Sequence, residues 1–246
     1  MAAIRLQSFQ APLNAVVIGA GGGIGRAFAS LLASCAEVGG LLLTARATAV
    51  PGAVRLDLTD EASIAAAAET ARQRLGEVDL VIVATGMLHD GETLRPEKTI
   101  RALSGAALAR SFAVNATGPA LVAKHFLPLL PRHRKAVFAA LSARVGSIAD
   151  NQIGGWYAYR AAKAALNQLV CTAAIELARK HPQAVCVTLH PGTVDTALSR
   201  PFQAGVRAET LFTPEAAAQR LLAVIDGLEA TGTGRLHAWD GRVVPF

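Results

Sequence analysis

Short apolar runs alternate along the chain with longer segments in which apolar residues recur with helical period. The runs, rich in Val, Ile, Leu and Ala, predict buried strands at Leu13–Ile18, Gly40–Ala45, Val54–Leu56, Asp79–Val83, Ala136–Leu141, Val185–Leu189 and Gly234–Ala238. The periodic segments predict helices at Arg26–Cys35, Asp60–Leu75, Gly105–Leu130, Trp156–Val170 and Pro214–Leu228. This alternation has no linker or compositional break. It predicts a single α/β domain over residues 1–246, a doubly wound parallel sheet with helices on both faces.

Helix starts and aperiodic segments complete this pattern. Thr59 or Asp60 is expected to cap the second helix, and Thr213 followed by Pro214 to open the last one. Residues 87–96 are predicted to be a loop. Residues 197–211 are irregular, so a segment at about 197–212 is a candidate to cover a substrate.

A glycine-rich loop joins the first predicted strand to the first predicted helix. It reads Gly19-Ala20-Gly21-Gly22-Gly23-Ile24-Gly25. Glycines let the backbone approach a ligand closely, and a helix N-terminus offers free N–H groups and a partial positive charge. The strand–loop–helix context favours a phosphate site over a tight turn without a ligand.

The residue after the second strand bears on the choice of cofactor. An acid at this place would hydrogen-bond the ribose 2′-hydroxyl of NAD, but the strand ends in Thr44-Ala45-Arg46. The Arg46 guanidinium suits a 2′-phosphate, so we predict NADP(H); the alternative is an ordinary surface arginine. Asp57 and Gly86 follow the next two strands at the edge where ligands bind, although Asp57 also suits a turn or a helix cap.

Polar Asn115 lies inside the long predicted helix Gly105–Leu130. Pro119, four residues further on, cannot continue a regular helix, so we expect a kink near Asn115. A kink frees a backbone carbonyl and lets the amide reach a site; the alternative is a plain polar helix residue.

Tyr159 and Lys163 are four positions apart on a predicted helix and therefore share one face. A neighbouring ammonium favours the phenolate, so we expect Lys163 to lower the pKa of Tyr159 from its ordinary value of about 10. The phenol could then exchange a proton with a substrate oxygen near neutral pH. Tyr157 has Ala161 in the equivalent position, and hence no such partner. Taken alone, the pair also fits a solvated helix face.

Composition narrows the class of protein. With 52% hydrophobic and 17% charged residues, the 246-residue chain suits a compact globule. Its uncharged stretches are too short to span a membrane, and its N-terminus does not read as a signal peptide, so we expect a soluble, cytoplasmic protein.

The net charge of +6 comes from scattered arginines. The one dense basic run, residues 132–135, reads as a solvated turn, so nucleic acid is not an expected partner. Three widely spaced cysteines predict buried free thiols, and no metal or serine-hydrolase motif occurs.

The glycine loop, Asn115 in a kinked helix, the Tyr159-x-x-x-Lys163 pair and a Pro191-Gly192 turn occur together in this order. The combination resembles the short-chain dehydrogenase/reductase family over essentially the whole chain. The residues around Tyr159 and the Trp-Asp-Gly tail look most like its C-factor and sniffer-like carbonyl reductase branch. The resemblance implies a Rossmann fold of about seven strands and an NADP-dependent carbonyl reductase or alcohol dehydrogenase. It also implies a homodimer or homotetramer acting on a small carbonyl or alcohol substrate.

Site roles follow from the same resemblance. The implied catalytic residues are Tyr159 as acid/base, Lys163 to lower its pKa and hold the ribose, Asn115 to order a kink and a water, and a serine to polarise the carbonyl. The implied cofactor-binding residues are Gly19, Gly23, Ile24, Gly25, Arg46, Asp57, Ala84, Gly86, Tyr159, Lys163, Pro191, Gly192, Val194 and Thr196.

This chain departs from the family pattern in two places. Ile18 stands where a Thr usually precedes the first glycine. The carbonyl-polarising serine is usually the second of a Ser-Ser pair, and here the pair reads Ser142-Ala143. Ser142 or Ser147 supplies the hydroxyl, with Ser142 favoured, or that donor is missing. A missing donor to an oxyanion costs about 10²- to 10³-fold in rate. The second hypothesis is therefore a dinucleotide-binding sensing or interaction module with weak or no catalysis.

Overall fold

The computed structural model describes residues 4–47, 50–91 and 94–246. Within these ranges, eight strands form one sheet in the order β10-β9-β6-β5-β4-β1-β2-β3. Their bounds are β1 (Leu13–Ile18), β2 (Val38–Ala45), β3 (Val54–Arg55), β4 (Leu80–Val83), β5 (Ala136–Leu141), β6 (Ala184–His190), β9 (Leu236–Ala238) and β10 (Val243–Val244). All pairs are parallel except β9 with β10. The predicted parallel sheet is confirmed, and the C-terminal tail adds the antiparallel eighth strand that was not expected.

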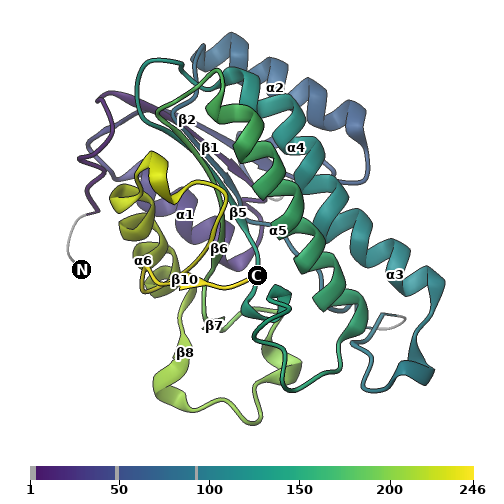
Figure 1. Cartoon of the computed structure of the whole chain (residues 1–246). Coiled ribbons are helices and arrows are strands. Elements are labelled where there is room, and N and C mark those ends of the chain that lie inside the picture. The colour runs from purple at the N-terminus through teal and green to yellow at the C-terminus, as the bar shows by residue number, and fades with distance from the viewer. Residues whose placement is uncertain (1–3, 48–49, 92–93) are drawn as a thin grey trace.

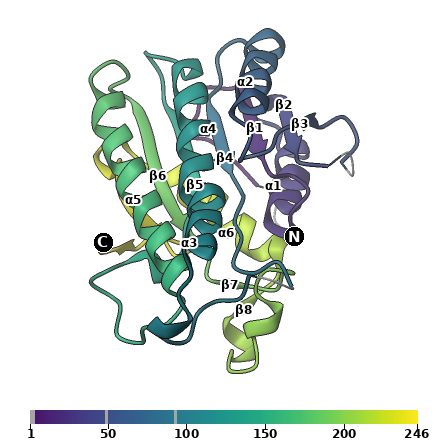
Figure 2. The ribbon, with the colours of Figure 1, turned by 90° about the vertical axis from the view of Figure 1, so that its right-hand side faces the viewer.

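Helices cover both faces of this sheet, as predicted. They are α1 (Gly23–Ala33), α2 (Glu61–Leu75), α3 (Gly105–Phe112), α4 (Gly118–Phe126), α5 (Tyr157–Ala178) and α6 (Pro214–Gly227). Helices α2, α4 and α5 lie on one face and α1 and α6 on the other (Figures 1 and 2). The Asp60 side chain caps α2 and that of Thr213 caps α6, which confirms those two helix starts. None of the helices in the described ranges is long and apolar enough to cross a membrane.

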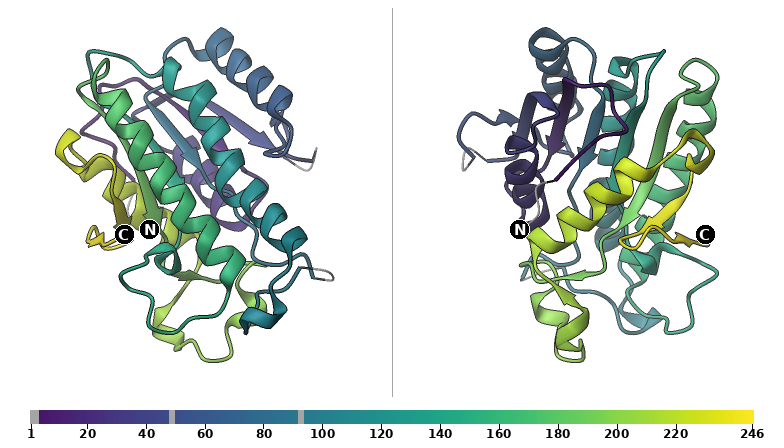
Figure 3. Two further views of the ribbon diagram at one scale, coloured as in Figure 1. Left: turned by 45° about the vertical axis from the view of Figure 1, so that its right-hand side comes forward. Right: turned by 90° about the vertical axis from the view of Figure 1, so that its left-hand side faces the viewer.

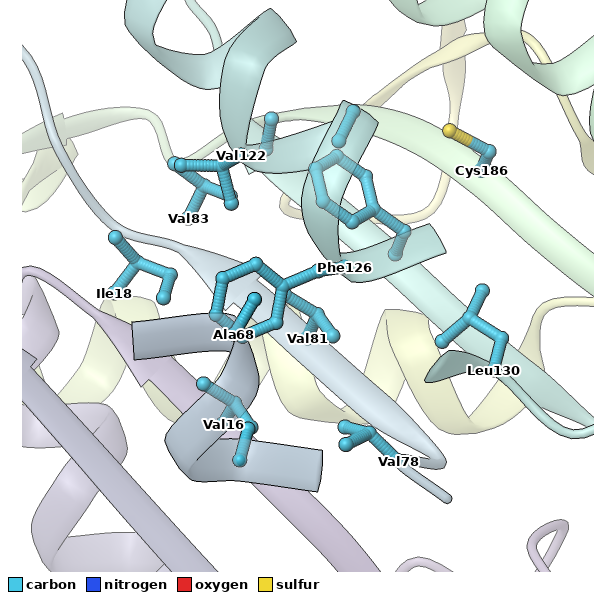
Figure 4. Packing of buried hydrophobic residues seen from close by; sticks show 14 of the residues in the cluster. Val16, Ile18, Ala68, Val78, Val81, Val83, Val122, Phe126, Leu130 and Cys186 are labelled. Carbon is cyan, nitrogen blue, oxygen red and sulfur yellow. The ribbon is translucent and has the colours of Figure 1, made fainter. Parts of the chain in front are cut away.

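Each face of the sheet has its own hydrophobic core, because successive side chains of a strand point to opposite faces. On one face, Val16 and Val81 pack with Phe126 of α4 and Ala68 of α2 (Figure 4). On the other face, the neighbouring residues Val17 and Ile82 of the same strands belong to the core under α1 and α6. Burial on both faces explains why the strands read as continuous apolar runs rather than alternating ones.

A small second sheet lies beyond the carboxyl ends of the main strands. It pairs β7 (Thr193–Val194) with β8 (Leu211–Phe212) in parallel. The segment between them holds two short 3₁₀ turns and projects past the sheet at the end where α3 and α5 begin (Figure 3). This is the stretch expected to be irregular, and neither short strand was predicted.

The predicted helix Gly105–Leu130 is interrupted. Helix α3 gives way at Ala113–Thr117 to a π-helical turn that contains Asn115, and α4 follows. Pro119 lies in the first turn of α4, where its missing N–H is tolerated. The expected kink near Asn115 therefore takes the form of a π-bulge.

Helix α5 begins at Tyr157, after Gly154, Gly155 and Trp156, which all have positive φ; the glycine pair was expected to precede this helix. One further expectation needs correction. The basic turn at residues 132–135 is not merely solvated, since Arg134 donates to Asp79 Oδ1 at 2.6 Å and Lys135 donates to three backbone carbonyls near the end of α6. The three cysteines are free, with Cys35 and Cys186 buried and Cys171 half-buried.

Candidate active site

The glycine loop closes tightly around the start of α1. A Cβ on Gly25 would lie 2.1 Å from the carbonyl oxygen of Gly19, and one on Gly23 would lie 2.8 Å from Thr196 Cγ2. Gly19 has a φ of +89°, which favours glycine. Gly22 caps α1 without a side-chain hydrogen bond, and the first turn holds no acidic residue. The first N–H groups of α1 are thus left for a ligand, and the cradle fits a pyrophosphate.

Arg46 and Asp57 lie at the same edge of the sheet. Arg46 is exposed directly after β2, while the backbone N–H groups of Gly19 and Ala20 bond to Thr44 at the end of that strand. Asp57 Oδ1 accepts from the backbone N–H and the hydroxyl of Thr59, and these bonds, with a smaller contribution from Arg46, lower the pKa of its carboxyl. The turn role considered for Asp57 is therefore present, and its other carboxyl oxygen is not used in that turn.

The Pro191-Gly192 turn brings the chain back to the glycine loop. Gly192 has a φ of +79°, and a Cβ there would lie 2.7 Å from the Phe212 ring. Val194 is buried in β7, and the Thr196 methyl packs at Gly23. This turn and the glycine loop, far apart in the sequence, thus lie side by side.

Gly86, Asn115 and Lys163 meet at the end of β4. A Cβ on Gly86 would lie 3.5 Å from Asn115 Oδ1 and 3.8 Å from Lys163 Nζ. The fully buried Asn115 amide donates to Met87 O at 2.8 Å and accepts from Met87 N at 2.9 Å. Ala84 precedes this point and bonds to Ile18 O at the end of β1. The π-bulge therefore ties the loop after β4 to α3 and α4, and brings Asn115 next to Lys163.

Tyr159 and Lys163 lie on the buried face of α5, exposed by 9% and 2%. Lys163 Nζ lies 5.8 Å from the centroid of the Tyr159 ring and donates to Leu141 O, at the end of β5, at 2.8 Å. Burial lowers the pKa of Lys163 to about 7. Burial raises the pKa of the Tyr159 phenol, which is opposite in direction to the lowering expected from Lys163, because desolvation disfavours the phenolate.

The two candidate serines differ in their surroundings. Ser147 is buried, and its Oγ accepts from the backbone N–H of Asp150 at 3.1 Å, within a turn. Ser142 Oγ is buried without a hydrogen-bond partner in the described chain. The Leu141–Leu189 pair precedes Ser142 and His190 on adjacent parallel strands, and His190 Nδ1 is also buried and unpartnered. Two buried polar atoms without a hydrogen-bond partner in the described chain, Ser142 Oγ and His190 Nδ1, thus lie at the ends of neighbouring strands. Ser142 directly follows Leu141, whose carbonyl accepts from Lys163.

An aromatic cluster beside Tyr159 escaped the sequence analysis. The Trp156 ring stands edge-on to two neighbours, with its centroid 6.4 Å from that of Tyr159 and 5.2 Å from that of Phe202. The Phe202 and His89 rings are also edge-on, with centroids 5.6 Å apart. His89 Nε2 lies 3.1 Å from Ala197 O. The members come from three loops, so no periodic pattern connects them in the sequence. Together Trp156, Phe202 and His89 form an aromatic wall next to the phenol.

The comparisons with known proteins agree on one family. The family model described as short chain dehydrogenase matches residues 13–206. The C-signal of Myxococcus xanthus is 39% identical over 140 residues, which cover 56% of this chain and 78% of that protein. The cis-4-hydroxycyclohexanecarboxylate dehydrogenase of Sinomonas cyclohexanicum is 32% identical over 248 residues, covering 92% and 94%.

Among solved structures, the NADPH-bound carbonyl reductase from chicken fatty liver superposes with a TM-score of 0.82 at 26% identity. The match covers 96% of this chain and 100% of that one. The C-signal and carbonyl reductase matches agree with the branch that the sequence resembles. With a family model spanning most of its length and a relative similar along nearly all of it, the chain belongs to the short-chain dehydrogenase family.

Proposed function

We propose that this chain is an NADP(H)-dependent carbonyl reductase or alcohol dehydrogenase in which Tyr159 is the general acid and base. The observation that carries the proposal is the convergence of Tyr159, Lys163, Asn115 and Gly86 at the end of the sheet that also holds the glycine loop. The similarity to an NADPH-bound carbonyl reductase supports the same reaction class.

The residues that would hold the cofactor fit an anionic dinucleotide. Gly19, Gly23 and Gly25, with Ile24 packed beside them, would line the pyrophosphate at the uncapped start of α1. Arg46 would meet a 2′-phosphate, and Asp57 the adenine side. The ribose and nicotinamide end would be met by Ala84, Gly86, Tyr159, Lys163, Pro191, Gly192, Val194 and Thr196. The bound cofactor supplies the hydride chemistry.

The chain itself would supply the proton and the oxyanion contact. The Tyr159 phenol would give its proton to the substrate oxygen in reduction and take it back in oxidation. An ammonium at Lys163 would favour the phenolate, and its pKa of about 7 means that a nearby anion would readily restore its charge. Ser142 would donate its unpartnered hydroxyl to the developing oxyanion. The segment at 197–212, with Phe202, would cover an apolar substrate against Trp156.

Replacing the phenol tests the assignment of Tyr159. Tyr159→Phe is expected to lower kcat for any carbonyl that the wild type reduces by at least about 10²-fold, because proton transfer is lost. The dissociation constant of NADPH should stay within about threefold, since the ring remains. Tyr157→Phe, with no ammonium one turn away, is the matched control and should keep wild-type turnover. Full activity in Tyr159→Phe would refute the role.

The Ser142-Ala143 departure separates the enzyme from a binding module. Ser142→Ala should lower kcat by about 10²- to 10³-fold if its hydroxyl serves the oxyanion. If the wild type binds NADPH but turns over no carbonyl in a broad panel, the sensing or interaction module is favoured. If activity then appears in Ala143→Ser alone, the lack of turnover in the wild type is due to the missing hydroxyl at position 143.

Arg46 should decide the cofactor preference. Arg46→Ala is expected to weaken NADPH binding about 10- to 100-fold, the loss of a charged hydrogen bond, with NADH binding unchanged. Fluorescence titration of both cofactors measures this. Arg55→Ala removes an exposed arginine from the neighbouring strand and serves as the control. An equal loss for NADPH and NADH would remove the 2′-phosphate assignment.

The buried lysine makes stability depend on pH. Burial lowers the pKa of Lys163 to about 7, so between about pH 7 and 10 the unfolded chain carries a proton that the folded chain lacks. The contribution of Lys163 to stability should therefore rise with pH in this window, so the slope of Tm from pH 7 to 9 should be less positive in Lys163→Met. Lys135, whose pKa burial lowers, adds a slope of the same sign, and Cys35 and Cys186, whose pKa burial raises, add slopes of the opposite sign; both proteins share these contributions. Equal slopes would contradict the burial of a neutral lysine.

A further inference from the structure

The residue before Tyr159 is held on both of its backbone polar groups by side chains far away in the sequence. The N–H of Ala158 donates to Glu97 Oε2 at 3.1 Å, and its carbonyl accepts from Ser111 Oγ at 3.2 Å. Both bonds are buried. The peptide groups on either side of Ala158 are thus fixed from the loop before α3 and from α3 itself.

Glu97 contributes more than one contact. It is only 5% exposed, although it is a glutamate in a loop, and its backbone carbonyl also accepts from the N–H of Trp156. Its second carboxyl oxygen is buried without a partner in the described chain. Burying a carboxyl group is costly, and a position with so little solvent is tolerated only where the group makes contacts that water cannot replace.

Ser111 continues the same network to the predicted site. Its Oγ accepts from Asn115 Nδ2 at 3.2 Å, and the Asn115 amide is bonded on both sides to the backbone of Met87. One chain of hydrogen bonds therefore runs from the loop after β4, through the π-bulge, to the peptide group that carries Tyr159.

Helix α5 needs such support at this end. Its N-cap is Trp156, which makes no side-chain capping bond and has a φ of +53°, a left-handed conformation that is unusual for a large residue. Gly154 and Gly155, directly before it, also have positive φ. Tyr159 is the third residue of α5, within the turn whose N–H groups have no intrahelical partner. Glu97 caps this turn in place of a local side chain.

We propose that Glu97 and Ser111 are positioning residues for Tyr159: by gripping Ala158 from both sides they fix the phenol relative to Asn115 and keep it shielded from water. For catalysis the inference rests on the proposed role of Tyr159. The grip itself can be measured without any substrate.

The chain has only two tyrosines, so Tyr157→Phe leaves Tyr159 as its sole phenol. In that background, near-ultraviolet absorbance of the phenolate reads the ionisation of Tyr159 directly. Because burial raises its pKa, the reference protein should form little phenolate up to about pH 10. Glu97→Ala and Ser111→Ala should admit water to the first turn of α5 and shift the onset of ionisation at least about tenfold in proton concentration towards that of an exposed tyrosine.

Matched variants separate positioning from general stability. Ser104→Ala removes a hydroxyl that caps the same helix α3 through Ala107 N, so it should lower Tm without moving the Tyr159 titration. Glu97→Gln keeps an oxygen for the Ala158 N–H and should restore most of the reference behaviour. Circular dichroism at each pH confirms that the protein is folded, and Ser111→Ala carries the test if Glu97→Ala does not fold.

Turnover gives the second reading. With a carbonyl that the wild type reduces, Glu97→Ala and Ser111→Ala should lower kcat about 10- to 100-fold while KM for NADPH stays within about threefold, because only the phenol is displaced. Titrations indistinguishable from that of Ser104→Ala would overturn the positioning role. Shifted titrations without any wild-type turnover would uphold the grip and count against the proposed enzyme instead.

Discussion

Burial of Lys163 is the constraint on which the arrangement of the site depends. Lys163 is only 2% exposed, and its Nζ donates to the carbonyl of Leu141 at the end of β5. Desolvation disfavours the charged form, so the pKa falls to about 7. A hydrophobic residue would fill the same space at no such cost, and perturbed groups of this kind gather at functional sites.

The close fit around that lysine requires residues without side chains. A Cβ on Gly146 would lie 2.8 Å from Lys163 Cβ, and one on Gly86 would lie 3.8 Å from Lys163 Nζ. The segments that follow β4 and β5 can therefore pack directly against α5. The glycine loop shows the same close approach, since Gly25 allows α1 to begin in contact with the turn after β1. At these points glycine lets backbone approach backbone, which brings Lys163 to the ends of the strands and the start of α1 to the end of β1.

Much of this could be predicted from the sequence, for identifiable reasons. Doubly buried strands such as Leu13–Ile18 and Ala136–Leu141 read as unbroken apolar runs, and their observed bounds match the predicted ones. Short edge elements such as β10 have two residues and no periodicity to detect. Within the site, local spacing pairs Tyr159 with Lys163. The aromatic wall and Glu97 depend on loops that only the fold brings together. The direction of the phenol's pKa depends on burial, which spacing does not reveal.

Ala143, which stands where the family usually has a serine, is close in the fold to two other groups that can form hydrogen bonds, Ser142 and His190. Within the described residues, the buried hydroxyl of Ser142 has no hydrogen-bond partner, and neither has His190 Nδ1 at the end of the adjacent strand β6. Burial lowers the pKa of His190 to about 4, so it is neutral near pH 7 and can accept or donate a hydrogen bond through Nδ1 according to its tautomer. Buried polar atoms are normally satisfied. In the proposed reaction, a substrate oxygen that takes its proton from the Tyr159 phenol would also accept from the Ser142 hydroxyl.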